Sequence, residues 1–508
     1  MGAERIGDRA MKASRLLGGN AGLSGVGLIR AAAILCACAT ALVLARPSSA
    51  SAASGLEVGF GKADITPDPK GKTPVWLAGF ANNRRADRIH DPLWARALVL
   101  RDGTRKIAFV SVDLVGFMLP NARNVRKSLK DFYYTMVSST HNHEGPDTIG
   151  LWGPFPGRSG VDPVYMAEIE RQIVRAARDA EANLAPVSAV YGAAEDESLL
   201  SDSRKPVVKD GVLRVLKFLK PDGQAHAILV QWNCHPENLG SRNRAITADF
   251  PYGAVQALEE RHKCPVAYFS GAVGGLMSAP DNQLKGKDGR LLPEGDFEFA
   301  EVYGRAVADL ADRALKQSSP MALTPFQAAV EPVALKLDNP LYKLAWAAKT
   351  IDRDAFAWTG DPKRLGSKLE TRDARVDGAI ETEVGCLRLG ELHVAAIPGE
   401  LYPELVYGRF QDPADPNADH PQASLETPVM KILPGPKALI FGLANDEVGY
   451  IIPKRQWDDR PPFAYGRDRK QYGEINSVGP ETAPALMQAL RDAANAVAAN
   501  REAEGGER

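Results

Sequence analysis

The chain has 508 residues, of which 44% are hydrophobic and 25% are charged, and its formal net charge is -1. A chain of this length and composition can bury a large core, which excludes disorder of the whole protein. Acidic and basic residues nearly balance and no dense run of Lys or Arg occurs, so the sequence does not indicate a nucleic-acid partner.

The N-terminus has the organisation of a cleavable secretory signal. Basic residues precede an apolar run at 31–45, and small residues follow, with Ala50-Ser51-Ala52 as a suitable cleavage site. The apolar run is shorter than the roughly 20 residues that a membrane-spanning helix needs. The segment from Leu35 to Cys38 resembles a lipoprotein acylation site, but the hydrophobic residues after it favour ordinary cleavage. We predict a signal peptide at 1–53 and export of 54–508 to the periplasm or the exterior.

Beyond the signal, buried strands and amphipathic helices alternate along the chain. Strands are predicted at 106–112, 133–137, 227–232, 265–269 and 327–337, and helices at 165–183, 252–261, 299–316 and 484–500. The segments 383–389 and 392–397 predict a hairpin around Gly390-Glu391. The segments 281–293, 412–417 and 460–462 are typical of surface loops. The pattern predicts an α/β fold, and since no internal repeat occurs we expect one compact unit.

Three of the five cysteines lie beyond the signal, at Cys234, Cys264 and Cys386. One disulfide and one free thiol are compatible with export. Because three cysteines cannot form a dense disulfide framework, the fold must rest on its hydrophobic core.

Two histidines leave the predicted strand at 133–137, in the segment Thr140-His141-Asn142-His143. If the strand continues, His141 and His143 face the same side, because side chains alternate along a strand. Two imidazoles on one side suit a divalent metal such as zinc. Histidines also serve as ordinary hydrogen-bonding residues, so this motif alone leaves both interpretations open.

A second strand, 227–232, leads to another histidine, His235, and Pro236 restricts the backbone directly after it. Cys234 invites interpretation as a nucleophile. Neighbouring residues of an extended segment point to opposite faces, however, so we expect Cys234 to pack in the core.

Two further strand ends present polar or small residues. Glu400 follows the strand that ends at Ile397, where it could complete a set of metal ligands or favour the start of a helix near Leu401. The glycine-rich stretch 270–278 follows another strand, so its backbone could approach a ligand and present Ser278. It matches neither a phosphate-binding loop nor a nucleophile elbow.

Taken in order, these segments resemble the catalytic domain of neutral ceramidases, zinc amidases that cleave the N-acyl bond of ceramide. The resemblance covers nearly the whole chain after the signal. It rests on matches at Val58-Gly59-Phe60-Gly61-Lys62-Ala63-Asp64-Ile65-Thr66-Pro67, Val112-Asp113, Ser139-Thr140-His141-Asn142-His143-Glu144-Gly145-Pro146, Ser203-Arg204-Lys205-Pro206, Cys234-His235-Pro236, Ala248-Asp249-Phe250, Pro398-Gly399-Glu400 and Gly442-Leu443-Ala444-Asn445 leading to Tyr450. The resemblance implies layered mixed β-sheets flanked by helices.

The resemblance also implies a zinc site and a set of catalytic residues. The family's zinc ligands carry over to His141, His235, Glu400 and Tyr450, although a core aromatic with a satisfied hydroxyl is an alternative for the tyrosine. The family's arginine, which contacts the reacting end of the substrate, matches Arg204. His143 would lie beside the metal as a proton shuttle or oxyanion partner.

Two departures from the family pattern bear on this assignment. Gly275-Leu276-Met277-Ser278-Ala279-Pro280 stands where the family has Gly-Asp-x-Ser-Pro-Asn, so Leu276 replaces an acid and the catalytic role of Ser278, as nucleophile or as a binding group, is open. The family's immunoglobulin-like C-terminal domain has no counterpart in 54–508, which we therefore expect to be the zinc hydrolase domain alone.

The expected function is that of a zinc-dependent amidohydrolase acting on a ceramide-like lipid. Zinc would activate water and polarise the scissile carbonyl. Two alternatives stay open: a metal-dependent hydrolase of another amide or ester, such as an acylated sugar or a peptide, and a catalytically silent exported protein that kept the fold. The expected partner is a small-molecule or lipid substrate, with transient contact to a membrane surface and no obligate protein partner.

Overall fold

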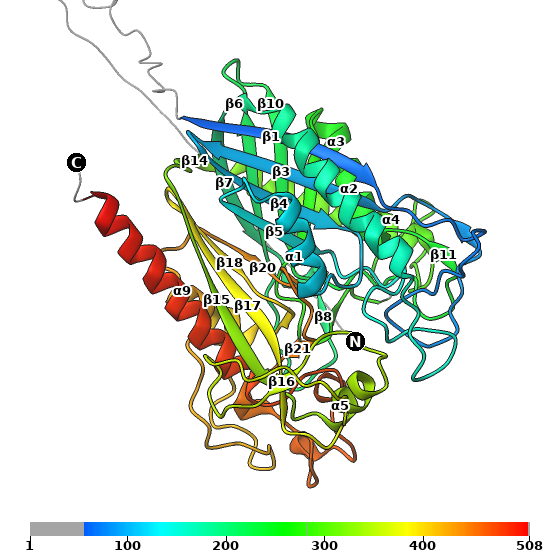
Figure 1. The fold of residues 1–508 in the computed structure, drawn as a ribbon. Helices are drawn as coiled ribbons and strands as arrows, with labels where there is room; N and C mark the ends of the chain where they lie inside the picture. Colours follow the sequence, from blue (N-terminus) through cyan, green and yellow to red (C-terminus); the bar gives the residue numbers. More distant parts are fainter. Residues whose placement is uncertain (1–54, 282, 506–508) are drawn as a thin grey trace, which may run out of the picture. The chain divides into compact units, whose positions relative to one another are not determined.

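Three β-sheets meet around a shared core (Figure 1). The structure is a computed structural model that describes residues 55–281 and 283–505, so the predicted signal peptide lies outside the described residues. Each of the three sheets contains both antiparallel and parallel neighbours, which confirms the predicted α/β fold with mixed sheets.

The strands of each large sheet come from one region of the chain. The first sheet has the order β5 (Tyr134–Ser139), β4 (Arg105–Val112), β3 (Trp94–Asp102), β1 (Leu56–Asp64) and β6 (Ala185–Pro186). The second has the order β12 (Val266–Ser270), β10 (Ala225–Trp232), β9 (Val212–Leu219), β7 (Ser188–Glu195) and β14 (Ser319–Met321). The third has the order β15 (Phe326–Lys336), β17 (Gly378–Leu389), β18 (Leu392–Ala396) and β20 (Ala438–Phe441), with β16 (Phe356–Ala357) beside β17.

Helices cover the outer face of each sheet (Figure 1). The first sheet packs against α1 (Leu119–Ser128) and α2 (Pro163–Ala182), the second against α3 (Asp249–His262) and α4 (Phe297–Lys316), and the third against α9 (Thr482–Gly505). The shorter helices are α5 (Pro340–Ala347), α6 (Glu404–Tyr407), α7 (Val429–Ile432), α8 (Tyr472–Ile475) and the single turns Glu197–Leu199, Lys454–Gln456 and Ala464–Gly466. This arrangement confirms that helices flank the layered sheets.

The inner faces of the three sheets share one hydrophobic cluster, which includes Phe109 of β4, Phe269 of β12 and Phe441 of β20. Burial of apolar surface here holds the sheets against one another. Close packing also governs the outer layers. A Cβ at Gly59 of β1 would lie 1.9 Å from the carbonyl oxygen of Ala180, so the glycine of the first family motif lets α2 lie directly on its sheet.

Every helix and strand that the periodicity predicts is present, with ends shifted by a few residues, and the hairpin at Gly390 is the antiparallel pair β17–β18. The pattern leaves several strands unpredicted, including β1, β7 and β20, and for two others, β3 and β9, the structure shows the reason. Each contains a buried arginine that interrupts its apolar run, Arg96 in β3 and Arg214 in β9. Asp113 pairs with the first at 2.8 Å, and the second lies 3.7 Å from Asp210 and donates to the hydroxyl of Tyr407 at 2.6 Å. These partners allow the charges to be buried.

The carboxyl ends of β5, β10, β18 and β20 lead into the polar segments that the sequence singles out. The segment after β18 continues into β19 (Glu400–Leu401), which pairs in parallel with β21 (Tyr450–Ile451). Two more short pairs, β13 (Met277–Ser278) with β8 (Ser201–Asp202) and β11 (Ala245–Ile246) with β2 (Arg88–Ile89), join neighbouring loops. Loops at strand ends hold side chains on a rigid scaffold, so this region is the natural place for a site.

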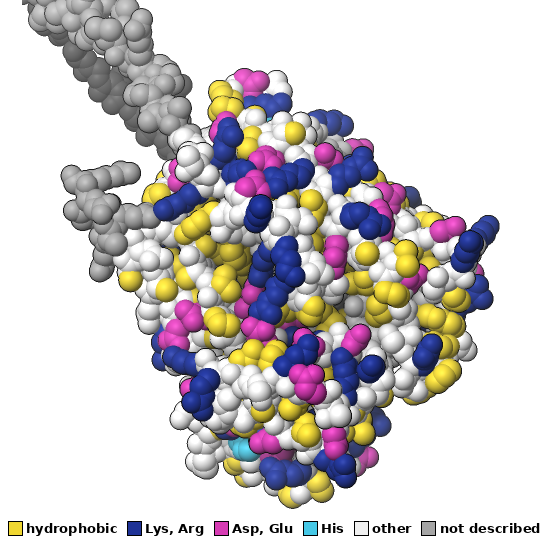
Figure 2. All heavy atoms as spheres, viewed as in Figure 1, with side chains coloured by type: hydrophobic (Ala, Val, Ile, Leu, Met, Phe, Trp, Pro, Cys, Tyr) yellow, Lys and Arg dark blue, Asp and Glu magenta, His cyan; other side chains and the backbone are white. Residues whose placement is uncertain are grey.

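The surface carries no extended area of one charge on the face shown in Figure 2, where acidic and basic side chains are interspersed. Within the described residues, no helix combines the length and apolar character needed to cross a bilayer.

Candidate metal centre

Three buried histidines come together where the sheet ends meet. One ring nitrogen from each of His141, His143 and His235 lies within 4.8 Å of the others, and all three side chains are buried. The ring centroids of His141 and His143 are 4.8 Å apart, and those of His141 and His235 are 4.9 Å apart. Imidazoles this close could together hold a metal ion.

His141 reaches the cluster by a different route from the one predicted. The strand ends at Ser139, and His141 adopts a left-handed φ of 67° instead of continuing it. The alternation argument is therefore wrong, although His141 and His143 do face one another. A left-handed backbone conformation costs free energy for a residue with a Cβ. It persists where surrounding contacts hold it, often at functional sites.

Backbone carbonyls orient two of the imidazoles. Nδ1 of His141 lies 2.7 Å from the carbonyl oxygen of Val115, and Nδ1 of His235 lies 3.0 Å from that of Met277. Each Nδ1 donates a proton to its carbonyl, so Nε2 is the atom directed into the cluster, where a metal would take the place of a proton on it. This is the tautomer that binds a metal through Nε2.

Glu400 adds a carboxylate to the cluster. Its Oε2 atom lies 2.9 Å from Nε2 of His235 and 3.4 Å from Nε2 of His141. Burial raises the pKa of this carboxyl, but the charges and hydrogen bonds of the two imidazoles lower it further, to about 2. Glu400 does not begin a helix, because it lies in β19 and α6 starts at Glu404.

Tyr450 is placed by its strand pairing with Glu400. The two residues are direct partners in the β19–β21 register, and the tyrosine ring lies 6.4 Å from the ring of His235. The side chain is buried, and burial followed by the charge of Glu400 raises the pKa of its hydroxyl well above the usual value. The structure thus brings His141, His235, Glu400 and Tyr450 to one place.

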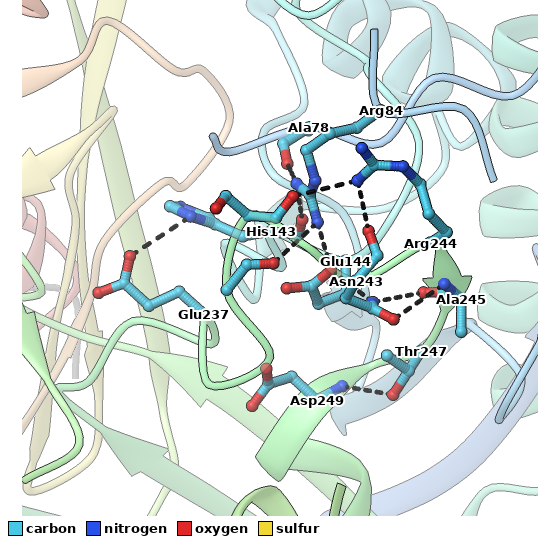
Figure 3. Close-up of polar contacts among 12 residues, drawn as sticks. Ala78, Arg84, His143, Glu144, Glu237, Asn243, Arg244, Ala245, Thr247 and Asp249 are labelled. Atoms are coloured by element: carbon cyan, nitrogen blue, oxygen red, sulfur yellow. Dashed lines mark hydrogen bonds and ion pairs between the residues drawn. The ribbon is translucent and has the colours of Figure 1, made fainter. Parts of the chain in front are cut away.

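His143 is buried on the other side of the cluster. Its Nδ1 makes no hydrogen bond and lies 3.5 Å from Oε2 of Glu237 (Figure 3). Burial, together with the neighbouring imidazoles and Arg84, lowers the pKa of His143 well below its usual value. Gly79 permits this position, because a Cβ there would lie 2.2 Å from Cγ of His143.

A buried ion pair behind His143 supports its backbone, and the sequence motifs do not reveal it. Arg84 donates to the carbonyl oxygen of His143 at 3.1 Å and pairs with Glu144 at 2.6 Å, while Asn243 donates to the same carboxylate at 2.7 Å (Figure 3). Burial raises the pKa of Glu144 to about 7 despite the charge of Arg84. The only sequence signal is that Glu144 directly follows His143.

Arg204 does not lie in the cluster. Its side chain is 1% exposed and forms two 2.9 Å contacts with the carboxylate of Glu474. Its guanidinium also stacks on the ring of Tyr402, with 4.9 Å to the centroid. Tyr402 in turn packs edge-on against Tyr450, so Arg204 contacts the wall behind the cluster.

Ser278 is linked to the cluster through Glu237, a residue that the sequence motifs do not reveal. The Ser278 hydroxyl donates to Oε1 of Glu237, whose other oxygen faces His143. The glycines before Ser278 approach protein rather than open space, since a Cβ at Gly274 would lie 2.6 Å from the carbonyl oxygen of Glu400. The position of Glu237, two residues after His235, was the available signal.

The three cysteines within the described residues are free and buried. Cys234 is fully buried, as predicted, and burial raises the pKa of its thiol well above the usual value. A thiol that resists ionisation does not act as a nucleophile.

Two cavities border the cluster. The first, of about 250 Å³, reaches His141, His143, Glu400 and Tyr450 between apolar walls that include Ile149, Leu151, Trp152, Leu341, Ile351 and Ile475. The second, of about 350 Å³, lies beside His143 and His235 and is lined by Phe80, Glu237, Ser241 and Leu276. The site is thus open to an apolar group on one side and to a more polar group on the other.

No known family model matches the sequence. Two solved structures are similar in fold. A neutral ceramidase from Pseudomonas aeruginosa matches with a TM-score of 0.65 and 19% identity over 87% of this chain and 74% of that one. A ceramidase complexed with C2 matches with a TM-score of 0.62 and 17% identity over 88% and 75% of the two chains. This confirms the predicted resemblance at the level of the fold.

Proposed function

We propose that this protein is a zinc-dependent amidohydrolase that cleaves the N-acyl bond of a ceramide-like lipid. The observation that supports this most directly is the buried set of His141, His235 and Glu400 at the end of an apolar cavity. The fold shared with two ceramidases agrees with the same chemistry.

The donor atoms fit zinc, which prefers nitrogen and carboxylate oxygen ligands in a tetrahedral arrangement. His141 and His235 direct Nε2 toward the carboxylate of Glu400, and the hydroxyl of Tyr450 would be the fourth ligand. The carbonyls of Val115 and Met277 supply the second layer of contacts that ligating histidines usually have. Zinc held here would supply Lewis-acid activation of the amide carbonyl and of a water molecule.

His143 is assigned to the reaction rather than to the ligand set. Its pKa is low, so the ring is neutral near neutral pH and can accept a proton and then deliver it to the leaving nitrogen. Arg84 and Gly79 fix where this ring lies. Ser278, which donates a hydrogen bond to Glu237, would bind the substrate on the same side of the cluster as His143. Arg204 stabilises the wall that supports Tyr450.

The apolar cavity favours a lipid over the alternative acylated sugar or peptide. Hydrocarbon is stabilised between apolar walls, whereas a sugar hydroxyl there would lose hydrogen bonds to water without replacement. The acyl chain of the substrate therefore occupies this cavity, with its carbonyl at the cluster. We also propose export through the N-terminal signal, which would place the enzyme beside extracellular or periplasmic lipids.

The metal assignment is tested by His141→Ala and His235→Ala, with His90→Ala as an exposed histidine control outside the cluster. We expect about one zinc per chain by elemental analysis in the parent and the control, and loss of zinc in the other two variants. Amide hydrolysis should disappear with the zinc and with chelation. Full zinc content and activity in both cluster variants would refute the proposal.

The variant His143→Ala tests whether His143 is a metal ligand or a catalytic residue. We expect it to keep zinc and to lose turnover by about 10²-fold or more, the range typical of a removed acid–base group. Loss of zinc instead would place His143 in the ligand set. Zinc-bound parent protein that hydrolyses no member of a fluorogenic N-acyl panel would favour the catalytically silent alternative.

A further inference from the structure

The second cavity at the cluster offers both polar and apolar surface. It has a volume of about 350 Å³, and His143 and Tyr450 line both this cavity and the first one. An amide whose carbonyl lies at the cluster therefore extends one half into each cavity. With the acyl half in the apolar first cavity, the amine half occupies the second. The polar lining of the second cavity includes the carboxylate of Glu237 and the hydroxyl of Ser241.

The apolar part of the second cavity is formed by Phe80, Ala81 and Leu276, which come from two segments far apart in the sequence. Two contacts fix the ring of Phe80: it packs edge-on against His143 with 5.3 Å between centroids, and the guanidinium of Arg84 lies 4.8 Å from its centroid. Leu276 packs in part against the hydrophobic core, and its side chain is half-buried. Hydrocarbon placed against this wall is stabilised, because both surfaces lose contact with water.

Leu276 occupies its place in this wall with an unfavourable backbone conformation. Its φ is 62°, in the left-handed region that a residue with a bulky side chain rarely adopts. The turn before it lies tightly against β19, since a Cβ at Gly274 would be 2.6 Å from the carbonyl oxygen of Glu400. The same leucine stands where the family pattern has an acid. Strain of this kind at the edge of a site indicates a role in binding, because asparagine or glycine would fit the turn better.

We propose that Leu276 is a specificity-determining residue that binds hydrocarbon in the amine half of the substrate. This inference rests on the proposed function and deepens it, since it assigns the second hydrocarbon chain of a ceramide-like lipid to the wall formed by Phe80 and Leu276. Glu237 and Ser241 then face the hydroxyl groups of the same half, with which their oxygens can form hydrogen bonds. An acid in place of Leu276 would lose its water to the hydrocarbon without compensation.

Two N-octanoyl amides test this inference, one of 2-aminooctane-1,3-diol and one of 2-aminopropane-1,3-diol. They share the acyl chain and both hydroxyl groups, and they differ only in the pentyl group that the first carries in its amine half. Release of octanoate is measured for the zinc-loaded protein at concentrations where neither amide aggregates. We expect the parent to prefer the pentyl substrate in kcat/KM, because that substrate alone reaches the apolar wall.

Leu276→Asn should lower the ratio of kcat/KM for the pentyl substrate to that for the other by about fivefold or more, as expected when part of the contact with a leucine side chain is lost. Leu276→Met keeps an apolar side chain of similar volume and should stay within about twofold of the parent ratio. Leu276→Gly removes the side chain at a φ that glycine favours and should lower the ratio as Leu276→Asn does.

Leu425→Asn is the matched control, because it makes the same change at a 41% exposed leucine that lines neither cavity. It should keep the parent ratio. Thermal unfolding and zinc content establish that each variant is folded and loaded. A parent without preference for the pentyl substrate overturns the inference, as does an unchanged ratio in Leu276→Asn and Leu276→Gly. Equal loss on both substrates also overturns it, since Leu276 would then act through the turn. If the zinc-loaded parent hydrolyses neither amide nor any other, the proposed function itself fails.

Discussion

At the residue scale, the cluster illustrates what neighbouring groups do to buried ionisable side chains. Glu400 and Glu404 are four positions apart and both are buried, yet their pKa values shift in opposite directions, to about 2 and to about 7. Two imidazoles contact Glu400, whereas burial dominates at Glu404 and the charge of Arg204 offsets it only in part. The carboxylate that faces the proposed metal is thus the one that stays ionised.

Glu404 makes stability depend on pH. Its folded pKa of about 7 exceeds the ordinary value of 4.5, so the unfolded state ionises first as pH rises. The contribution of Glu404 to the free energy of unfolding should therefore be highest below pH 4.5, fall between about 4.5 and 7, and level off above 7. At about 1.4 kcal/mol per pKa unit, this contribution is on the order of 3 kcal/mol.

Glu404→Gln should remove this loss, because glutamine is neutral at every pH. Thermal unfolding from pH 5 to 8.5 should show a smaller decrease of Tm with pH than in the parent, and a Tm at pH 8 at least equal to that of the parent. Glu370→Gln, at an exposed position, is the control and should follow the parent curve. A parent-like slope in Glu404→Gln would contradict the assignment.

At the scale of elements, the position of His143 depends on the loop that crosses behind it. Gly79 and Gly157 have similar positive φ angles, 92° and 83°, but only Gly79 touches His143. Alanine at either position would have an unfavourable backbone conformation that costs about 1–2 kcal/mol. At Gly79 alone, the new Cβ would also overlap the imidazole.

We therefore expect Gly79→Ala to lower kcat/KM at least tenfold through displacement of His143, since small misplacements of catalytic groups are costly. Gly157→Ala should lower Tm by a few degrees and keep the parent kcat/KM. Steady-state kinetics and thermal unfolding of the two variants separate the effects. Equal activity in both would mean that the loop adjusts without moving the ring.

At the scale of the whole molecule, exposed apolar side chains lie on the segments that wall the apolar cavity. Phe155 lies beyond Leu151 and Trp152 in the same loop and is 59% exposed, and Leu344 lies beside Leu341 on α5 and is 56% exposed. Exposed apolar side chains on the segments that wall a cavity proposed to bind lipid are suited to contact with a bilayer.

Phe155→Ser and Leu344→Ser should each reduce turnover of an N-acyl lipid in vesicles by about tenfold, since burial of such a side chain contributes about 1.5–3 kcal/mol. Turnover of a dispersed short-chain amide should stay at the parent level, because neither side chain lines the cavity. Val164→Ser, at a 74% exposed position on α2, is the control. Equal rates on vesicles for all three variants and the parent would exclude this surface.

The sequence by itself determined the secondary structure of long periodic segments and the polar residues at their ends. Hydrophobic periodicity is a local property, and His141, His235 and Glu400 each follow directly after a buried strand. The ordered motifs then predicted a fold that the structure confirms. Charged residues inside β3 and β9 hid those strands, because partners that allow their burial lie 17 positions away for Arg96, at Asp113, and 193 positions away for Arg214, at Tyr407.

Only the tertiary structure decided which of those residues meet. The ends of β5, β10 and β18 belong to three different sheets, and the shared core that aligns them depends on packing between sheets. The same packing places Arg204 behind Tyr402 instead of at the cluster. It also brings Glu237 between Ser278 and His143, although His143 lies more than 90 positions before Glu237 in the sequence. Side-chain proximity in a folded chain is set by long-range packing rather than by local pattern.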